Sequence, residues 1–450
     1  MTKPTKSREL ILDILLEVLE KGGHSHVILR QALEKYQYLE KQDRALITRV
    51  VEGTLEYRLT IDAVLDRVSK TPVEKMKPVI RTILRMSVYQ LLWMDRIPDR
   101  AVCSQAVELA EARRFHGLKG FVNGVLRSVS RRKEEFAFTD WSLRYSMPGW
   151  LIDRWKERYG AERTEGMLRA FLETPPTVVR CNLDRASLAE IRESLERQGA
   201  AVAESPFSPQ LLELSGYDHL ESLDAFVDGW IQVQDASSFL AGQAAAPKAG
   251  DRVLDVCAAP GGKSLHAADQ LAGTGLVVAR DLTEAKAELI EENIARTGYT
   301  NIRAEVWDAR EFDPEWEGQA DVVLADLPCS GLGIIGKKPE IKYQVSPGSI
   351  AELAALQREI LSVARRYVKP GGRLVYSTCT ISRQENEDQR AWFLEQFAEF
   401  EPESLAGRLS PAVEAESLRE GYIQLLPGRD PCDGFFIAAF RKQISEKHEI

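Results

Sequence analysis

A glycine-rich turn has the residue types and the spacing of a nucleotide-type cofactor site. It follows an apolar strand predicted at 252–257, and it comprises Cys257, Ala258, Ala259, Pro260, Gly261, Gly262 and Lys263. Its glycines let the backbone approach a ligand, and the amide dipoles of the helix that follows face the same place. Because glycine-rich turns are also common where no ligand binds, this turn alone is weak evidence.

Three aspartates strengthen the prediction of a cofactor site. Asp281, Asp308 and Asp326 each end one of the next three predicted strands. Asp281 lies about twenty residues after the glycines, where an acidic side chain accepts hydrogen bonds from ribose hydroxyls. A helix-capping role would explain any one of these aspartates, but it explains less well why all three end successive strands. We therefore expect the three carboxylates to converge on one cofactor site.

Two cysteines also lie just past predicted strand ends. Cys329 is in the sequence Asp-Leu-Pro-Cys-Ser-Gly, and Cys379 is in Tyr-Ser-Thr-Cys-Thr. Either cysteine alone would be interpreted as a small buried residue, but together they are expected to face one pocket as candidate nucleophiles. The six cysteines of the chain include no Cys-x-x-Cys pair, so the sequence predicts neither a metal site nor a disulfide framework.

A mostly parallel sheet is predicted to position these residues. Predicted strands cover 252–257, 276–281, 302–307, 321–326 and 373–377, and they alternate with predicted helices at 264–271, 284–297, 349–368 and 384–400. Such alternation indicates an α/β, Rossmann-like domain whose ligands bind at the carboxyl ends of the strands. Two further strands, at 422–426 and 434–440, are predicted to form a hairpin that closes the sheet.

The 450 residues predict two or three domains, at about 150 residues each. Residues 1–137 have apolar positions at helical spacing and predict an all-α bundle. Residues 138–230 are predicted to be a tryptophan-rich connector followed by a small α+β subdomain, and residues 231–445 the α/β domain. We therefore expect a multidomain protein.

The charge of the chain is unevenly distributed. Its formal net charge is −9, but residues 1–140 hold 25 Lys and Arg against 19 Asp and Glu. A basic helical region on an acidic chain is compatible with nucleic acid as a partner, and a helical docking or dimerisation module is the alternative. No apolar run reaches the roughly 18 residues of a membrane span, and the N-terminus lacks a signal peptide. We expect a cytoplasmic protein with no membrane partner.

The cysteine and glycine motifs together resemble those of the RNA cytosine-5 methyltransferases. The front end resembles the NusB-like RNA-binding domain in Gly-Phe-Val-Asn-Gly-Val-Leu-Arg at 120–127 and in Ile-Leu-Arg-Met-Ser-Val-Tyr-Gln-Leu-Leu at 83–92. Over essentially its whole length the chain is therefore similar to the ribosomal RNA small subunit methyltransferase B (Sun/Fmu) family. The resemblance implies a class I methyltransferase domain and S-adenosylmethionine as cofactor. It also implies methyl transfer to carbon 5 of cytosine 967 in 16S ribosomal RNA, free or in an assembling subunit, by a monomer without a metal.

The resemblance also implies roles for individual residues. The family's S-adenosylmethionine site is matched by the residues from Cys257 to Lys263 and by Asp281, Asp308 and Asp326. In that match Asp281 binds the ribose and Asp308 lies near the adenine. Cys379 matches the nucleophile that adds to carbon 6 of cytosine, and Cys329 matches the second cysteine, which helps to release the product. Lys263 is a candidate for the positive charge that lowers the thiol pKa, and Asp326 a candidate to bind the cytosine edge.

Three lysines, Lys337, Lys338 and Lys342, match a family stretch that lies near RNA, although a basic loop is more often merely solvated. The chain departs from the family pattern at Met147, where His is expected.

Two alternative functions remain open from the sequence. The same chemistry could act on transfer RNA or another RNA, or the chain could be a non-catalytic RNA-binding assembly factor. The presence of both cysteines weighs against the second alternative. Amino-group methylation would more typically show Asn/Asp-Pro-Pro-Tyr after the fourth strand, where this chain has Asp-Leu-Pro-Cys.

Overall fold

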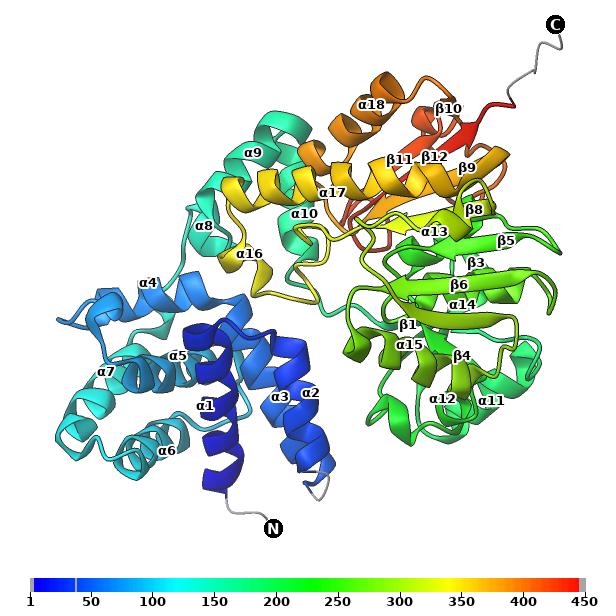
Figure 1. Cartoon of the computed structure of the whole chain (residues 1–450). Coiled ribbons are helices and arrows are strands. Elements are labelled where there is room, and N and C mark those ends of the chain that lie inside the picture. The colour runs from blue at the N-terminus through cyan, green and yellow to red at the C-terminus, as the bar shows by residue number, and fades with distance from the viewer. Residues whose placement is uncertain (1–3, 37–38, 445–450) are drawn as a thin grey trace, which may run out of the picture. The chain divides into compact units, whose positions relative to one another are not determined.

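The computed structural model describes residues 4–36 and 39–444 (Figure 1). The chain divides into two compact units. The helical unit consists of Met1–Thr174 together with Ile335–Gln344, and the sheet unit consists of Pro175–Ile334 together with Val345–Ile450. Each unit is described by itself below.

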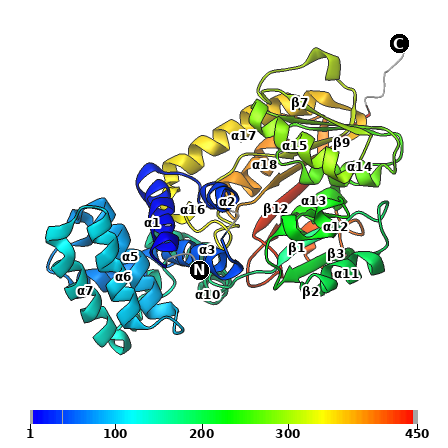
Figure 2. The same ribbon diagram turned by 90° about the horizontal axis from the view of Figure 1, so that it is seen from below.

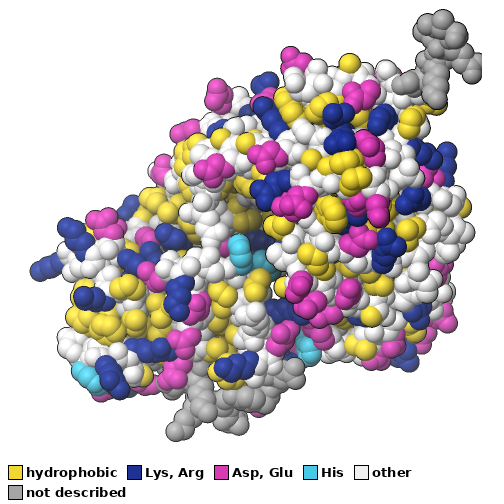
Figure 3. Space-filling model, viewed as in Figure 1, with side chains coloured by type: hydrophobic (Ala, Val, Ile, Leu, Met, Phe, Trp, Pro, Cys, Tyr) yellow, Lys and Arg dark blue, Asp and Glu magenta, His cyan; other side chains and the backbone are white. Residues whose placement is uncertain are grey.

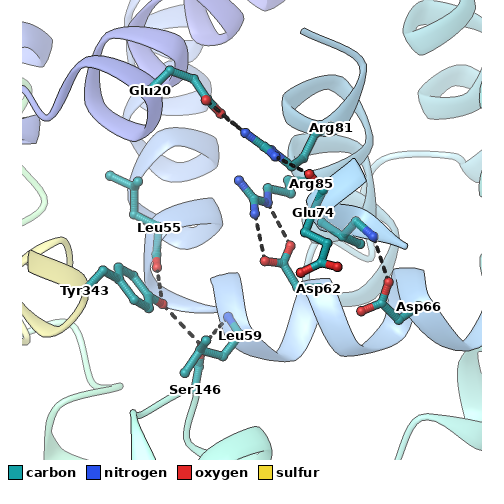
Figure 4. Close-up of polar contacts among 11 residues, drawn as sticks. Glu20, Leu55, Leu59, Asp62, Asp66, Glu74, Arg81, Arg85, Ser146 and Tyr343 are labelled. Atoms are coloured by element: carbon teal, nitrogen blue, oxygen red, sulfur yellow. Dashed lines mark hydrogen bonds and ion pairs between the residues drawn. The ribbon is translucent and has the colours of Figure 1, made fainter. Parts of the chain in front are cut away.

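The helical unit is a bundle, as the sequence predicts. Its helices are α1 (Pro4–Lys21), α2 (Ser25–Lys35), α3 (Lys41–Glu56), α4 (Arg58–Val68), α5 (Pro78–Trp93), α6 (Asp99–Ala112), α7 (Lys119–Arg131), α8 (Trp141–Arg144), α9 (Gly149–Tyr159), α10 (Ala161–Ala170) and α16 (Ile341–Gln344). Helix α5 is buried along most of its length and packs against α1, α3, α4, α6 and α7. Its Arg85 binds both carboxylate oxygens of Asp62 on α4 at 2.7 Å, which satisfies the buried guanidinium (Figure 4).

A ten-residue segment from the second half of the sequence belongs to the helical unit. Side chains of this segment, Ile335–Gln344, bind the ends of two helices. An acidic side chain lies at a helix N-terminus and a basic one at a helix C-terminus. Glu340 accepts hydrogen bonds from the backbone N (2.9 Å) and Oγ (2.8 Å) of Ser25 at the start of α2. At the end of α3, Lys342 Nζ donates to the carbonyl of Glu56 (2.7 Å), and Tyr343 Oη donates to that of Leu55 (2.8 Å; Figure 4). The segment thus satisfies backbone groups that helix ends leave without partners.

The sheet unit contains a small antiparallel sheet of four strands in the order β2-β3-β1-β4. These are β1 (Thr177–Cys181), β2 (Ala201–Ser205), β3 (Ser208–Ser215) and β4 (Ile231–Val233), with helices α11 (Leu188–Arg197) and α12 (Asp224–Val227). A capping box begins α11, because Ser187 and Glu190 each bind the other's backbone N–H. This small α+β element confirms the fold class predicted for this region.

The large sheet has eight strands, with the order β10-β12-β9-β8-β5-β6-β7 and β11 paired to β12. Figure 2 labels three of them, β12, β9 and β7. They are β5 (Arg252–Asp255), β6 (Leu276–Asp281), β7 (Ile302–Val306), β8 (Ala320–Asp326), β9 (Val368–Thr378), β10 (Phe400–Pro402), β11 (Tyr422–Leu425) and β12 (Phe435–Lys442). The strands from β5 to β9 are parallel, whereas β12 runs antiparallel to β9 and pairs with β11. The predicted parallel sheet and its terminal hairpin are therefore both present.

Helices cover both faces of the large sheet. They are α13 (Ala236–Ala245), α14 (Gly262–Gln270), α15 (Glu284–Thr297), α17 (Pro347–Tyr367) and α18 (Glu387–Gln396). Successive strand residues point to opposite faces, so Val253 packs in the same cluster as residues of α13 and α14, whereas Leu254 packs with residues of α17 and α18. Because the five strands from β5 to β9 are parallel, their carboxyl ends lie at one edge of the sheet.

The boundaries of the units differ from the predicted division at 137 and 230. Residues 138–174 lie in the helical unit, and residues 175–230 lie in the sheet unit. Residues 175–230 lie in the same unit as the residues after 230 because β4, which begins at Ile231, pairs with β1 in the register Val179↔Val233. A boundary at 230 would cut the small sheet. The predicted end of the α/β domain at 445 lies outside the described residues.

Candidate functional site

The glycine-rich turn connects β5 with the first turn of α14. Gly261 is the N-cap residue with a φ of +102°, and an added Cβ would lie 3.3 Å from Cγ2 of Ile290. Both the positive φ and the close approach favour glycine at this position. No atom within 4 Å would meet a Cβ on Gly262. The N-terminus of α14 is therefore open to a ligand, as a helix-dipole anion or nucleotide site requires.

Asp281 binds the turn from the end of the neighbouring strand. Its Oδ2 accepts a hydrogen bond from the backbone N of Ala259 (2.9 Å), and its Oδ1 accepts from the backbone N of Leu282 and from Lys286 Nζ (both 2.8 Å). A carboxylate can accept about four hydrogen bonds, and these three are made to Asp281 from the turn, from the next residue and from the first turn of α15. Leu282 itself is 54% exposed, which places an apolar surface beside the carboxylate.

Asp308 lies two residues beyond the end of β7 and is half-buried. It accepts hydrogen bonds from Nη2 of Arg310 (2.6 Å) and from the backbone N of the same residue (3.0 Å). These hydrogen bonds from Arg310 hold the pKa of Asp308 below its usual value. The structure thus places Asp308 at the expected edge of the sheet, with its carboxylate bound to Arg310.

Lys263 and Asp326 form an ion pair at the ends of α14 and β8. Lys263 Nζ lies 2.6 Å from Asp326 Oδ2, and Asp326 Oδ1 accepts a hydrogen bond from Ser377 Oγ (2.7 Å). Burial lowers the pKa of Lys263, but the negative charge of Asp326 and its hydrogen bond more than offset this effect, so the pKa is raised. Lys263 therefore stays charged, and its charge also interacts with Cys379.

Beneath this pair, Asp255 at the end of β5 is almost fully buried. Its Oδ2 accepts a hydrogen bond from Ser264 Oγ at 2.6 Å. Burial raises the pKa of Asp255 to about 7, against the opposing effect of the Ser264 hydrogen bond. Asp255 and Ser264 come from β5 and α14, the two elements that flank the glycine-rich turn, so their contact holds the two ends of the turn together.

The two cysteines predicted to face one pocket lie side by side. Cys329 Sγ and Cys379 Sγ are 3.3 Å apart, and both residues are partly exposed. The hydrogen bond to Cys379 and burial raise the pKa of Cys329 well above its usual value. Either sulfur can be the donor in this pair, but when Cys379 is a thiolate only Cys329 can donate. Lys263, at the end of the glycine-rich turn, interacts with Cys379, so the two thiols and this turn lie in one site.

The three predicted RNA-contact lysines have different environments. Lys337 is exposed and Lys338 is half-buried, whereas Lys342 is only 2% exposed. The ammonium of Lys342 binds the Glu56 carbonyl, and burial lowers its pKa to about 7. The expectation that Lys342 contacts RNA is therefore corrected, because its ammonium is buried in the helical unit and donates a hydrogen bond there. Met147, the departure from the family pattern, is also buried in that unit, at 1% exposure.

Sequence reasoning missed several residues that complete the site. They are Ser264, Lys286, Ser377, Glu385 and Asn386. Ser264 directly follows Lys263 and Ser377 lies two residues before Cys379, so this proximity in the sequence was the available signal. Lys286 is five residues after Asp281, on the first turn of the following helix, a spacing that brings the two side chains together.

The described part of the chain shows two further properties. Within residues 4–36 and 39–444, no group of three or more His, Cys, Asp or Glu side chains is arranged to hold a metal ion. None of the helices in these ranges combines the length and the apolar character that crossing a membrane requires.

Three known families match consecutive parts of this chain. Residues 5–131 match the NusB family, residues 147–218 match the ferredoxin-like domain of RsmF/B-like methyltransferases, and residues 243–441 match the 16S rRNA methyltransferase family RsmB/F. The probable ribosomal RNA small subunit methyltransferase B of Bacillus subtilis is 36% identical over 98% of this chain and 100% of its own length. The Klebsiella pneumoniae ribosomal RNA small subunit methyltransferase B is 33% identical, also over 98% of this chain and its own full length.

Solved structures agree with this arrangement. The crystal structure of PH0851 superposes with a TM-score of 0.84 at 29% identity, covering 98% of this chain and 100% of that protein. A methyltransferase homologue from Pyrococcus horikoshii superposes with a TM-score of 0.58 at 28% identity, covering 67% of this chain and 98% of its own.

Proposed function

Because this chain belongs to the ribosomal RNA small subunit methyltransferase B family, we propose that it methylates carbon 5 of cytosine 967 in 16S ribosomal RNA through a covalent adduct with Cys379. It is an S-adenosylmethionine-dependent RNA methyltransferase. The observation that supports the covalent mechanism is the pair of thiols 3.3 Å apart beside the Lys263–Asp326 ion pair. Action on ribosomal RNA agrees with the cytoplasmic location expected from the sequence.

The residues of the turn fit S-adenosylmethionine. The open N-terminus of α14 and the Asp281 carboxylate at the strand end suit a nucleoside with ribose hydroxyls, and the exposed Leu282 suits a flat apolar ring. Asp308 is proposed to lie near the adenine. When bound, the cofactor supplies an electrophilic methyl group.

The two thiols divide the work on the base. Carbon 5 of cytosine is a poor nucleophile until the Cys379 thiolate adds to carbon 6 and turns the ring into an enamine. The Cys329 thiol donates a hydrogen bond to Sγ of Cys379 and so stabilises the thiolate. After methyl transfer, a water molecule accepts the carbon 5 proton, and the electron pair of that C–H bond re-forms the double bond between carbons 5 and 6. The bond between carbon 6 and sulfur then breaks, and its electron pair returns to Cys379. The same hydrogen bond stabilises this leaving thiolate.

Asp326 is proposed to accept a hydrogen bond from the N4 amino group of cytosine and, once addition at carbon 6 lets N3 take up a proton, a second one from N3–H. Lys263 and Ser377 bind its two oxygens from the protein side, so the carboxylate is held in one orientation and needs little reorganisation. The target base must be unstacked to reach these groups, so it should lie in a loop or be flipped. Of the predicted RNA-contact lysines, Lys337 and Lys338 remain proposed RNA contacts.

Mapping 5-methylcytosine in ribosomal RNA tests the proposed function. RNA from cells that lack the protein should lose a single 16S site, at position 967, and a plasmid copy should restore it. Loss of methylation in transfer RNA instead would identify another RNA as substrate. An unchanged map would favour a non-catalytic assembly factor.

Asp281→Ala should weaken S-adenosylmethionine binding by about 1.5 to 3 kcal/mol, the usual worth of a hydrogen bond that involves a charged group. Part of the loss comes from the turn, because the backbone N of Ala259 loses its acceptor. Titration calorimetry on the purified variant measures the effect, and Glu288→Ala, an exposed change on the following helix α15, is a matched control. An unchanged affinity would remove Asp281 from the cofactor site.

The helical unit is proposed to bind RNA, and a groove between α6 and α7 offers a test. The exposed residues Arg100 and Arg127 line this groove together with Glu108, and its volume is about 700 Å³. On the face seen in Figure 3, Lys and Arg side chains are interspersed with acidic and apolar ones.

Replacing both Arg100 and Arg127 with alanine should weaken RNA binding and make it less dependent on salt. If each arginine neutralises one phosphate, the slope of log affinity against log salt should fall by about 1.4 to 1.8. Filter binding at several salt concentrations measures the slope, and Glu108→Gln in the same groove should leave it unchanged. An equal slope for both proteins would exclude this groove from the RNA interface.

A further inference from the structure

Glu385 and Asn386 are consecutive, polar and fully buried, and the mechanism described so far uses neither. Both have 0% exposure, in the connection between β9 and α18. Among the residues that the structure describes, no cation is within ion-pair distance of the Glu385 carboxylate. A buried carboxylate without such a cation is costly unless hydrogen bonds compensate it. The identity of those hydrogen-bond donors therefore indicates what the residue is for.

Glu385 binds the turn that carries Cys329. Its Oε1 accepts a hydrogen bond from the backbone N of Ser330 (2.7 Å), and its Oε2 accepts from Ser330 Oγ (2.6 Å). On the other side of the cysteine, Gln357 of α17 donates to the carbonyl of Pro328 (2.9 Å) and also reaches Glu385 Oε1 (3.5 Å). Both neighbours of Cys329 are thus fixed.

Asn386 does the same for Cys379. Its Oδ1 accepts a hydrogen bond from Thr378 Oγ1 (2.6 Å), and its Nδ2 donates to the carbonyl of Thr380 (2.9 Å). Thr380 Oγ1 lies 2.8 Å from Ser330 Oγ, so the two cysteine turns are also joined directly. Because Ser330 Oγ donates to Glu385, it accepts from Thr380, and the chain of hydrogen bonds has one consistent direction.

We propose that the Glu385–Asn386 pair is a positioning unit, which holds the two cysteine turns so that the Sγ atoms of Cys329 and Cys379 stay within hydrogen-bond distance. The effect of this pair on catalysis rests on the proposed function, in which Cys379 is the nucleophile and Cys329 assists release of the product. Besides fixing the turn, the negative charge of Glu385 adds to the effects that raise the pKa of Cys329, after the Cys379 hydrogen bond and burial. Without the pair, Cys329 should lose both its position and its preference for the thiol form, and release of the product should slow.

The test uses the full-length protein and two variants that act on the same contact from opposite sides. Glu385→Gln removes the charge and places an amide donor against the donors of Ser330, whereas Ser330→Ala removes one donor and leaves the backbone contact. Glu395→Gln, the same chemical change at an exposed position on the adjoining helix α18, is the matched control. Circular dichroism and S-adenosylmethionine binding establish that each variant is folded.

Two measurements report on the thiols without requiring methyl transfer. A bis-thiol reagent, dibromobimane, should bridge Cys329 and Cys379 in the wild type and in Glu395→Gln, and about tenfold more slowly in Glu385→Gln. Peptide-resolved alkylation with iodoacetamide should show the midpoint pH of Cys329 moving down in Glu385→Gln, because a charge that favours the thiol has been removed. Ser330→Ala should show smaller changes of the same kind, and the double variant should not exceed Glu385→Gln, since both residues act through one contact.

The outcomes separate this inference from the proposed function. Wild-type bridging and an unmoved alkylation midpoint in both folded variants would overturn the positioning role, whatever the activity. Fully additive effects in the double variant would also overturn it. Altered thiol chemistry together with accumulation of a protein–RNA adduct in Glu385→Gln would support it. Altered thiol chemistry with no adduct in any variant, Cys329→Ala included, would support positioning and refute the covalent mechanism.

Discussion

Cys379→Ala should give neither methylated RNA nor a protein–RNA adduct, whereas Cys329→Ala should accumulate a covalent complex that carries the methyl group. Without the Cys379 thiolate no bond to carbon 6 forms, and the loss of methyl transfer should be complete within detection. Without Cys329, addition and methyl transfer can still occur, but the thiolate that leaves has lost its hydrogen-bond donor at 3.3 Å. The adduct therefore persists.

Denaturing electrophoresis with RNA labelled at one end, and cofactor labelled in its methyl group, measures both results together. S-adenosylmethionine binding should survive in both variants, which distinguishes lost chemistry from lost folding. Cys432→Ala, a partly exposed cysteine in the loop between β11 and β12, is a control that should behave as the wild type. An adduct in Cys379→Ala and its absence in Cys329→Ala would reverse the two roles.

The sequence was sufficient to predict the large sheet because its signals are local. The strand at 276–281 is predicted and observed with the same bounds, and so is the helix at 284–297. Short apolar runs alternate with amphipathic helices, and the chain order alone then implies parallel strands. The carboxyl ends of such strands share one edge, which is why the sequence predicts that the three aspartates converge on one site and that the two cysteines face one pocket.

Contacts between residues far apart in the chain account for the features that the sequence did not predict. Lys342 looked like one of three basic loop residues, but its environment is set by α3, 286 positions away in the chain. The pairing of β4 with β1 is another such contact, since it joins positions about fifty residues apart. Glu385 and Asn386 carry no motif of their own, and only the folded chain shows that they bind residues next to the two cysteines.

Asp326→Asn should lower kcat by about 10²- to 10³-fold, the range found when one preorganised group that stabilises developing charge is removed. Asparagine keeps the size of the side chain, but it cannot offer two negative oxygens to the cytosine edge. It also leaves Lys263 without its counter-charge, and the Lys263 side chain is only 11% exposed. The pKa of Lys263 should therefore fall, because burial is then no longer offset by the charge of Asp326.

Two further variants assign the loss of rate in Asp326→Asn to the base rather than to the ion pair. Ser377→Ala keeps the carboxylate and removes only the hydroxyl that binds its Oδ1 at 2.7 Å, so it should cost about tenfold or less. Combining Lys263→Met with Asp326→Asn removes the uncompensated ammonium, so the double variant should regain stability over Asp326→Asn without regaining kcat. Single-turnover methylation measures the rate, and urea unfolding measures the stability. Recovery of rate together with stability would show that Asp326 acts only through Lys263, and the cytosine contact would have to be assigned to another residue.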